Sequence, residues 1–176
     1  MPRARLGRVW VGGDGEPVRL VGGVINVSPE SFFKGSVRRT VDDALKAAEA
    51  MVSSGVDIID VGGMSTAPYN KTVISTDEEV NRVVPVIKAL RREFPELTIS
   101  IDTFRSRVAE EALNAGADVV NDVTGLKGDS DIARVISNHG ASVIIMARER
   151  VPGLGGNPHQ QDHRCLEGEP GGDCIK

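Results

Sequence analysis

Four apolar stretches of the sequence each end in a side chain that could hold or react with a polar ligand. Asn26 ends the first, Asp60 and Asp102 end the second and third, and Asn121 with Asp122 ends the fourth. An amide or carboxylate buried without a partner costs a few kcal/mol. Such groups can read the donor and acceptor edge of a nitrogen-rich ring, and a carboxylate in a closed site can stabilise a cationic transition state.

Nothing at these positions indicates covalent catalysis. They offer no cysteine or lysine, and no serine with a suitable histidine partner. The segments SPESFFKGS (28–36) and GGMSTAP (62–68) add hydroxyl groups, glycine N–H groups and Lys34, which suit an anionic group. Ser28 and Ser31 are interpreted as turn residues. The pattern predicts a site for a polar, nitrogen-rich ligand with an anionic end.

Alternating strands and helices must position these groups. The strands are predicted over 21–27, 56–61, 97–102, 117–122 and 141–147. The helices are predicted over 40–54, from Thr76 to about Phe94, over 106–115, and over roughly 129–138. The strand segments are apolar almost throughout. This is typical of parallel strands that are covered on both faces and joined by helical crossovers.

Local signals mark the element ends. Thr40 is predicted to cap the first helix at its N-terminus and Gly55 at its C-terminus, while Thr76–Glu79 forms a capping box for the second. Gly116 closes the helix over 106–115. Ahead of the first long strand, a β-hairpin is predicted with arms at 8–11 and 18–21 around a Gly-Asp-Gly turn.

Two α/β architectures fit this order: a doubly wound sheet and a (β/α)8 barrel. The first long strand is followed by neither G-x-G-x-x-G nor G-x-x-x-x-G-K-[ST], which disfavours the nucleotide-binding open sheets. Polar residues at the C-terminal ends of several strands converge at the mouth of a barrel. We therefore predict a (β/α)8 barrel fold of which about the first five βα units are present, preceded by the hairpin. Asp60 alone is better interpreted as a residue that holds its own loop.

Composition sets further bounds. The chain has 176 residues, is 40% hydrophobic and 26% charged, and has a net charge of −4. No basic patch indicates nucleic-acid binding, and no apolar run approaches the roughly 18 residues of a membrane span. A cytoplasmic protein is expected. Residues 1–150 are predicted to form the partial barrel and 151–176 an irregular tail. The late cysteines and histidines (His159, His163, Cys165, Cys174) match no zinc-ligand spacing.

Three motifs carry a family resemblance. VINVSPESFFKGS (24–36) resembles the first signature of dihydropteroate synthases, L-N-V-T-P-D-S-F, and DIIDVGGMSTAP (57–68) resembles the second, which contains G-G-E-S-T-R-P. ISIDTFRSRVAEEALNAGADVVNDVTGL (99–126) resembles the third strand, helix and fourth strand, with S-V-D-T and a later I-N-D. The resemblance runs from about residue 20 to 147 and indicates the pterin-binding superfamily. SPESF and the preceding hairpin look more like the archaeal members.

The resemblance implies an activity. Such enzymes are (β/α)8 barrels that condense 6-hydroxymethyl-7,8-dihydropterin diphosphate with p-aminobenzoate in folate biosynthesis. A pterin cation develops as diphosphate departs, and Mg²⁺ steadies the leaving group. By resemblance, Asn26 would help to hold Mg²⁺–diphosphate, and Thr66, with Ser65 beside it, would contact diphosphate or the aryl amine. Asp102 would stabilise the cation, and Asn121 would hydrogen-bond the pterin ring.

The chain also departs from the family pattern. Met64 and Ala67 stand where the family has glutamate and arginine, so the acceptor could be a related aryl amine. Met146 would line the pterin pocket or pack in the core, and Met146-Ala147-Arg148 replaces M-H-M. The motifs D-P-G-F-G, S-R-K and R-x-H of strands six to eight are absent from the sequence. A homo-oligomer or a complementing C-terminal barrel half is expected as partner. The alternatives are a methyltetrahydrofolate–corrinoid methyltransferase and an inactive pterin-binding fragment.

Overall fold

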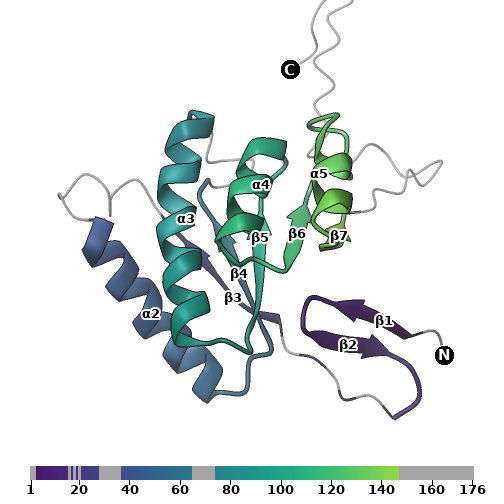
Figure 1. Cartoon of the computed structure of the whole chain (residues 1–176). Coiled ribbons are helices and arrows are strands. Elements are labelled where there is room, and N and C mark those ends of the chain that lie inside the picture. The colour runs from purple at the N-terminus through teal and green to yellow at the C-terminus, as the bar shows by residue number, and fades with distance from the viewer. Residues whose placement is uncertain are drawn as a thin grey trace, which may run out of the picture.

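The computed structural model describes residues 3–15, 17, 19, 21–27, 37–64 and 74–146, and its centre is one parallel sheet. Five strands follow one another across it in chain order, without a reversal (Figure 1). They are β3 (Val21–Asn26), β4 (Ile58–Gly62), β5 (Thr98–Asp102), β6 (Val119–Asp122) and β7 (Ser142–Ile145). The five predicted strands are confirmed, with ends that differ by up to two residues.

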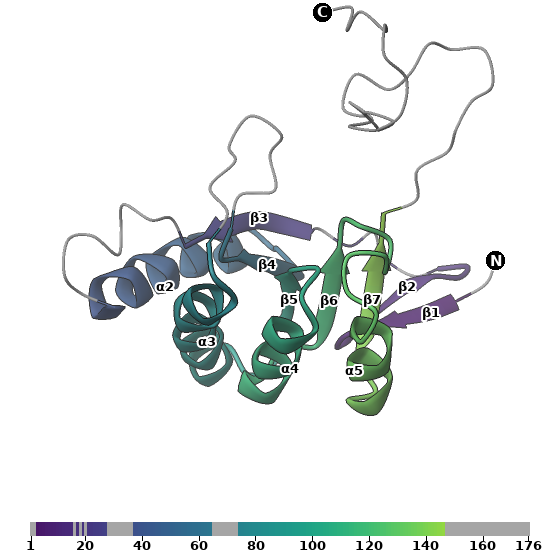
Figure 2. The ribbon, with the colours of Figure 1, turned by 90° about the horizontal axis from the view of Figure 1, so that it is seen from above.

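In the described part of the chain, four helices connect the strands and all lie on one side of the sheet (Figure 2). They are α2 (Val37–Ser53), α3 (Thr76–Glu93), α4 (Ser106–Ala115) and α5 (Ile132–Asn138). A doubly wound sheet carries helices on both faces, whereas a barrel carries them only outside. The predicted barrel-type α/β fold is therefore confirmed, with five parallel strands joined by α2 to α5 in the described residues, and the doubly wound alternative is not.

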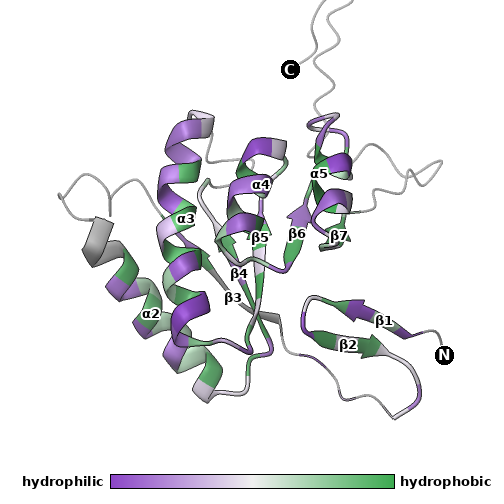
Figure 3. Cartoon of the chain, in the orientation of Figure 1, coloured by the Kyte–Doolittle hydropathy of each residue, from purple (hydrophilic) through white to green (hydrophobic). Residues whose placement is uncertain are grey.

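The core fills the space between the sheet and the helices. Successive side chains of a strand point to opposite faces, so alternate residues of each strand meet the apolar stripes of the helices, which are visible in Figure 3. The strands contribute Ile59, Val61, Ile99, Ile101 and Val120, and the helices contribute residues such as Val83, Ile87, Leu90, Val108 and Ala112. The other strand residues, which include the predicted site groups, face the side that these helices leave uncovered.

Two predicted caps need correction. Helix α2 begins at Val37, so Thr40 lies inside the helix and does not cap it. Helix α3 is capped by Ser75, whose hydroxyl accepts a hydrogen bond from the N–H of Glu78 at 3.1 Å, one residue before the predicted box. The C-terminal prediction at Gly116 is confirmed, since this residue adopts a left-handed φ of 113° directly after α4.

The N-terminal hairpin exists and its predicted arm at 8–11 is confirmed to within one residue, but the strand that pairs with this arm precedes it and does not lie at 18–21. Strand β1 (Arg3–Leu6) pairs with β2 (Val9–Gly12) in antiparallel register. The two-residue turn between them has Gly7 at its first position with a φ of 58°. This placement is typical of the hairpin turns whose twist matches the strands. The tight turn at Gly7 explains why β2 pairs with the segment before it. The Gly-Asp-Gly segment follows the hairpin instead of forming its centre.

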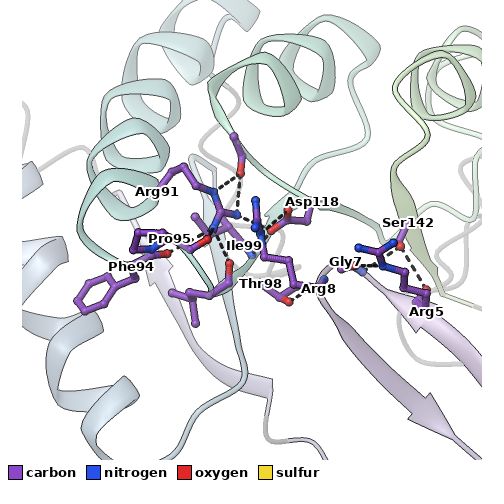
Figure 4. A network of polar contacts seen from close by, with 12 residues as sticks. Arg5, Gly7, Arg8, Arg91, Phe94, Pro95, Thr98, Ile99, Asp118 and Ser142 are labelled. Carbon is purple, nitrogen blue, oxygen red and sulfur yellow. Dashed lines mark hydrogen bonds and ion pairs between the residues drawn. The ribbon is translucent and has the colours of Figure 1, made fainter.

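The hairpin turn binds the N-terminal ends of the sheet strands (Figure 4). The Gly7 N–H donates to the Ser142 hydroxyl at 3.0 Å, and the Arg8 N–H donates to the Thr98 hydroxyl at 3.1 Å. The guanidinium of Arg8 pairs with Asp118 at 3.1 Å. The hairpin therefore lies at the end of the sheet opposite the predicted site. In barrels, residues at this end contribute to stability and not to the chemistry.

Arg91 is the centre of this network. It pairs with Asp118 at 2.5 Å, and its guanidinium donates to the backbone carbonyls of Gly116, Pro95 and Leu97 at 2.8–3.0 Å. One side chain of α3 thereby fixes the segments that lead into β5 and β6. None of the helices within the described residues is long and apolar enough to cross a membrane. The predicted tail over 151–176 lies outside the described residues.

We expect Arg91→Ala to destabilise the chain by about 3 kcal/mol, because it removes one of the two guanidinium groups that pair with Asp118 and leaves several carbonyls without their charged donor. Urea denaturation followed by circular dichroism measures the change. Arg92→Ala is the matched control, since Arg92 is an exposed neighbour in α3, and it should change the stability by less than about 0.5 kcal/mol. Equal effects of the two substitutions would contradict the role given to Arg91.

Candidate functional site

Three of the predicted site residues lie in one row across the C-terminal ends of the strands. Asn26 pairs in register with Gly62, Gly62 with Asp102, and Asp102 with Asn121. Residues in register on parallel strands point to the same face, so the three polar side chains share the face that the helices leave uncovered. The sequence-based expectation that Asn26, Asp102 and Asn121 meet at one end of the sheet is confirmed.

Gly62 keeps the row open between two of these side chains. A Cβ atom at this position would lie 3.2 Å from the Asn26 Oδ1 atom and 3.8 Å from the Asp102 Cβ atom. Any larger residue would fill the space between the amide and the carboxyl group. The Asn26 side chain is exposed, while the strand residues on either side of it, Ile25 and Val27, are buried. The amide at the end of this apolar strand therefore reaches out of the core.

A second polar layer lies beneath the row. Asp60 on β4 is in register with Ser100 on β5 and is buried. Its Oδ2 atom accepts a hydrogen bond from the Asn121 amide at 3.1 Å. Asp60 thus orients a neighbouring site residue from within the sheet, and the interpretation of Asp60 as a residue that holds its own loop needs correction. With its nitrogen held by Asp60, the amide of Asn121 presents its oxygen to the row.

Three buried oxygen atoms near the row have no hydrogen-bond partner within the described part of the chain. They are the Oδ1 atoms of Asp60 and Asp102 and the hydroxyl oxygen of Ser100. All three residues occupy the same face of β4 and β5. An unsatisfied buried polar atom costs about 1–3 kcal/mol, and each one in a folded protein calls for an explanation. Acceptors gathered on one face suit a ligand that offers several N–H donors.

The electrostatics of the row favour a protonated carboxyl group. Burial, reinforced by the nearby charges of Asp60, Glu79 and Asp122, raises the pKa of Asp102 from 3.8 to about 7. Burial also raises the pKa of Asp60, against the opposing effect of its hydrogen bond from the Asn121 amide. At neutral pH, Asp102 can therefore donate a proton or accept a hydrogen bond, and a cation beside it would favour its ionised form.

The other predicted residues are distributed differently. Ser65 and Thr66 lie outside the described residues, as do Ser28, Ser31 and Lys34. Met146 follows the end of β7 with 48% of its surface exposed, and only its backbone N–H contact with the Asp122 carbonyl, at 3.2 Å, ties it to β6. Its place in a pocket stays a prediction.

Asp122 was grouped with Asn121 by sequence, but it points the other way. Its carboxylate is buried and accepts hydrogen bonds from the N–H and hydroxyl groups of Thr124, both at 2.7 Å, and from the N–H of Leu126 at 2.9 Å. Consecutive residues of a strand face opposite sides, so Asp122 shapes the loop after β6. Period-two alternation could have separated the two residues.

Sequence reasoning missed a polar cluster behind the row. Glu79, Arg82 and Thr103 are almost completely buried, and Arg105 is partly buried beside them. Glu79 was interpreted only as a member of a capping box. Its inward direction follows from the place of its helix against the sheet, for which the sequence carries no local signal. Among the described residues, no group of three or more histidine, cysteine, aspartate or glutamate side chains could hold a metal ion.

The chain belongs to the pterin binding enzyme family, whose pattern matches residues 22–167. The dihydropteroate synthase of Clostridium beijerinckii is 42% identical over 124 residues, which are 70% of this chain and 45% of that protein. The chain therefore spans about half the length of the curated relatives it matches.

Solved structures agree with this membership. The dihydropteroate synthase of Clostridium difficile, solved in the presence of pteroic acid, has a TM-score of 0.68 at 42% identity and covers 79% of this chain and 52% of that one. The 7,8-dihydropteroate synthase of Vibrio fischeri has a TM-score of 0.71 at 36% identity and covers 86% and 52%. The resemblance seen in the three sequence motifs is confirmed.

The raised pKa of Asp102 predicts a pH-dependent stability. The folded carboxyl binds its proton more tightly than the unfolded one, so its contribution to folding is most favourable below about pH 4 and is lost as the pH rises to about 7. Relative to Asp102→Asn, the wild-type chain should lose about 2 kcal/mol over this range. This is roughly half of the full shift, because solvent screens a partly exposed group.

Urea denaturation of both chains between pH 4 and pH 8 measures this difference. Asp77→Asn provides the control, since Asp77 is exposed in the first turn of α3, and its difference from wild type should not follow the same course. A difference between wild type and Asp102→Asn that stays constant with pH would contradict the raised pKa.

Proposed function

We propose that this chain supplies the pterin-reading part of a dihydropteroate synthase-type transferase. The reaction joins the amine of p-aminobenzoate, or of a related aryl amine, to the methylene carbon of 6-hydroxymethyl-7,8-dihydropterin diphosphate, with diphosphate as leaving group. The observation that carries the proposal is the row of Asn26, Asp102 and Asn121, in and beneath which buried oxygens have no hydrogen-bond partner among the described residues. Membership in the pterin binding enzyme family supports the same conclusion.

The polar row suits the edge of a pterin ring. The Asn121 amide nitrogen is held by Asp60, which leaves the amide oxygen to accept from a ring N–H group. The free oxygens of Asp60 and Asp102 offer further acceptors on the same face. Because a missing ligand donor would leave these buried acceptors unpaired, the arrangement discriminates strongly against rings without N–H groups.

Asp102 is the residue we assign to the chemical step. As the carbon–oxygen bond breaks, its electron pair leaves with diphosphate and positive charge develops on the pterin methylene. An ionised Asp102 beside that charge would stabilise it, and the burial of the carboxyl group strengthens the interaction. The amine lone pair then forms the carbon–nitrogen bond, and the amine nitrogen loses a proton. No protein nucleophile is required.

Mg²⁺ fits this site as a companion of the substrate. Asn26 offers an exposed amide oxygen at the end of β3, and Mg²⁺ prefers oxygen ligands, commonly one or two from the protein together with substrate phosphates. The described residues provide no cluster that would hold the ion alone. When bound, Mg²⁺ supplies neutralisation of the charge on the departing diphosphate. Ser65, Thr66 and Met146 remain proposed substrate contacts.

Turnover, in this proposal, requires a closed barrel. A barrel of this class has eight strands, and the described residues supply five, of which β3 and β7 each pair with one neighbour. A complementing C-terminal barrel half or a second copy of the chain would provide the remaining wall. A cytoplasmic location belongs to the same proposal and is supported by the ordinary charged composition of the chain.

Pteroic acid is the first ligand to test, because a related structure was solved in its presence. We expect saturable binding to this chain, followed by ligand fluorescence, and at least about tenfold weaker binding to Asn121→Leu, which loses the ring acceptor. Asn114→Leu is the control, since Asn114 is an exposed asparagine of α4. Equal affinities of wild type and Asn121→Leu would contradict the assigned role.

A second measurement distinguishes between two hypotheses: an active transferase and an inactive pterin-binding fragment. The chain is mixed with the C-terminal half of a related synthase, and diphosphate release is followed with pterin diphosphate and several aryl amines. Release with at least one amine supports the transferase. Ligand binding without release under any of these conditions would leave a pterin-binding module and overturn the catalytic assignment.

Mg²⁺ should bind this chain only together with diphosphate. Calorimetry with Mg²⁺ alone is expected to give no saturable signal, whereas Mg²⁺ with inorganic diphosphate should bind. Asn26→Ala should weaken that binding by about tenfold. The unfolding midpoint should stay unchanged, because the Asn26 side chain is exposed. Asn81→Ala, at an exposed position of α3, is the control. A comparable loss of stability and binding in Asn26→Ala would count against the assignment.

A further inference from the structure

Glu79 is a buried charged residue for which the proposed reaction has no use. It lies in the first turn of α3, and only 1% of its surface is exposed. One carboxylate oxygen accepts a hydrogen bond from the Thr103 hydroxyl at 2.9 Å, and the other pairs with the Arg105 guanidinium at 2.6 Å. Both contacts come from the turn that follows β5, directly behind the row of candidate site residues.

Thr103 connects this carboxylate to two residues of the row. It follows Asp102 in the chain, and its own N–H group donates to the Asn121 carbonyl at 3.2 Å. The Thr103 hydroxyl also accepts from the N–H of Arg105 at 3.2 Å. A shift of the Thr103 side chain therefore moves the backbone that carries Asp102 and loosens the contact with the backbone of Asn121.

Two arginines of the polar cluster around Glu79 hold the backbone at Gly63 and at Ile74, between β4 and α3. Arg105 donates to the Ile74 carbonyl at 2.9 Å, and Arg82 donates to the Gly63 carbonyl at 3.0 Å. Gly63 itself lies against α3, because a Cβ atom there would be 2.8 Å from Val83 and 3.0 Å from the Glu79 side chain. Backbone groups that follow β4 and precede α3 are thus tied to the cluster around Glu79.

Stability alone is a poor explanation of this buried pair. The cost of removing two charges from water often exceeds their attraction, and apolar residues of similar volume can replace such pairs without loss. The same two helices are also joined at the surface by Asp77 and Arg107, at 2.7 Å, with exposed fractions of 70% and 62%. The buried contacts additionally fix the orientation of the Thr103 and Arg105 side chains, since hydrogen bonds restrict the angle between the groups they join.

We propose that Glu79 is a positioning residue, which through Thr103 and Arg105 sets the placement of Asp102 and Asn121. The assignment of a pterin to that row rests on the proposed function. A displacement of about 1 Å at such a site can cost on the order of a hundredfold in rate. Glu79 acts by holding other residues in place and does not touch the ligand.

Two substitutions of Thr103 test the proposal. Thr103→Val keeps the shape of the side chain but removes the hydroxyl that donates to Glu79, and it should raise the dissociation constant for pteroic acid by about tenfold. Thr103→Ser restores the hydroxyl and should bring the constant back to within about twofold of wild type. Arg107→Ala, in the exposed pair between the same helices, is the control and should bind like wild type.

The nuclear magnetic resonance signal of the Asn121 side-chain amide, recorded without ligand, provides a second readout. It should move in Thr103→Val and in Glu79→Gln, and return in Thr103→Ser. If wild type binds no pteroic acid, the proposed function fails, while this signal still decides on the positioning role. An Asn121 signal and a ligand affinity that are unchanged in Thr103→Val would overturn the inference, as would losses that only follow the unfolding midpoint.

Discussion

The site depends on the parallel register of the four neighbouring strands from β3 to β6. This register brings Asn26, Asp102 and Asn121 into one row, although 95 positions separate the first from the last in the sequence. Side chains alternate between the faces of a sheet, so a slip of one residue would turn each polar group into the apolar core and each core residue outwards. The hydrophobic contacts with α2 to α5 therefore hold the site geometry as well as the fold.

Negative charge is concentrated where water is scarce. Asp60, Asp102, Asp122 and Glu79 lie near one another at the C-terminal ends of the strands, and two different kinds of contact make the charges of Glu79 and Asp122 tolerable. Glu79 is paired with Arg105, and Asp122 is bound by N–H and hydroxyl groups of its own loop. Asp102 has neither kind of contact, and a raised pKa is the physical result. Within the described residues, the one of these four carboxyl groups without a hydrogen-bond partner thus belongs to the row to which we assign the ligand.

Much of the fold could be predicted from local patterns, and the reasons for the exceptions are physical. The helix over Ser106–Ala115 and the glycine that closes it follow from periodicity and from the special conformation of Gly116. One hairpin arm was misplaced because two glycine-containing turns were possible, and contacts of Gly7 with Thr98 and Ser142, far away in the sequence, favour the first.

The site follows the same division. The alternation of strands and helices in the sequence indicates a barrel-like order of elements. This order brings the residues at the strand ends together on one face. The hydrogen bond between Asp60 and Asn121, by contrast, joins strands that are not neighbours in the sheet. The inward direction of Glu79 depends on how α3 rolls against β4. Neither the Asp60–Asn121 hydrogen bond nor the direction of Glu79 could be predicted from a single sequence, because each depends on how the elements pack.

The contacts of the hairpin turn also order events in time. Gly7 and Arg8 bind residues that lie 135, 90 and 110 positions further along the chain. Closing such long loops costs entropy that only the finished contacts repay. During synthesis, the hairpin turn must therefore wait until Thr98, Asp118 and Ser142 have emerged and their strands have paired. The turn is made before its partners and is secured after them, so its docking marks the completion of the sheet from β5 to β7.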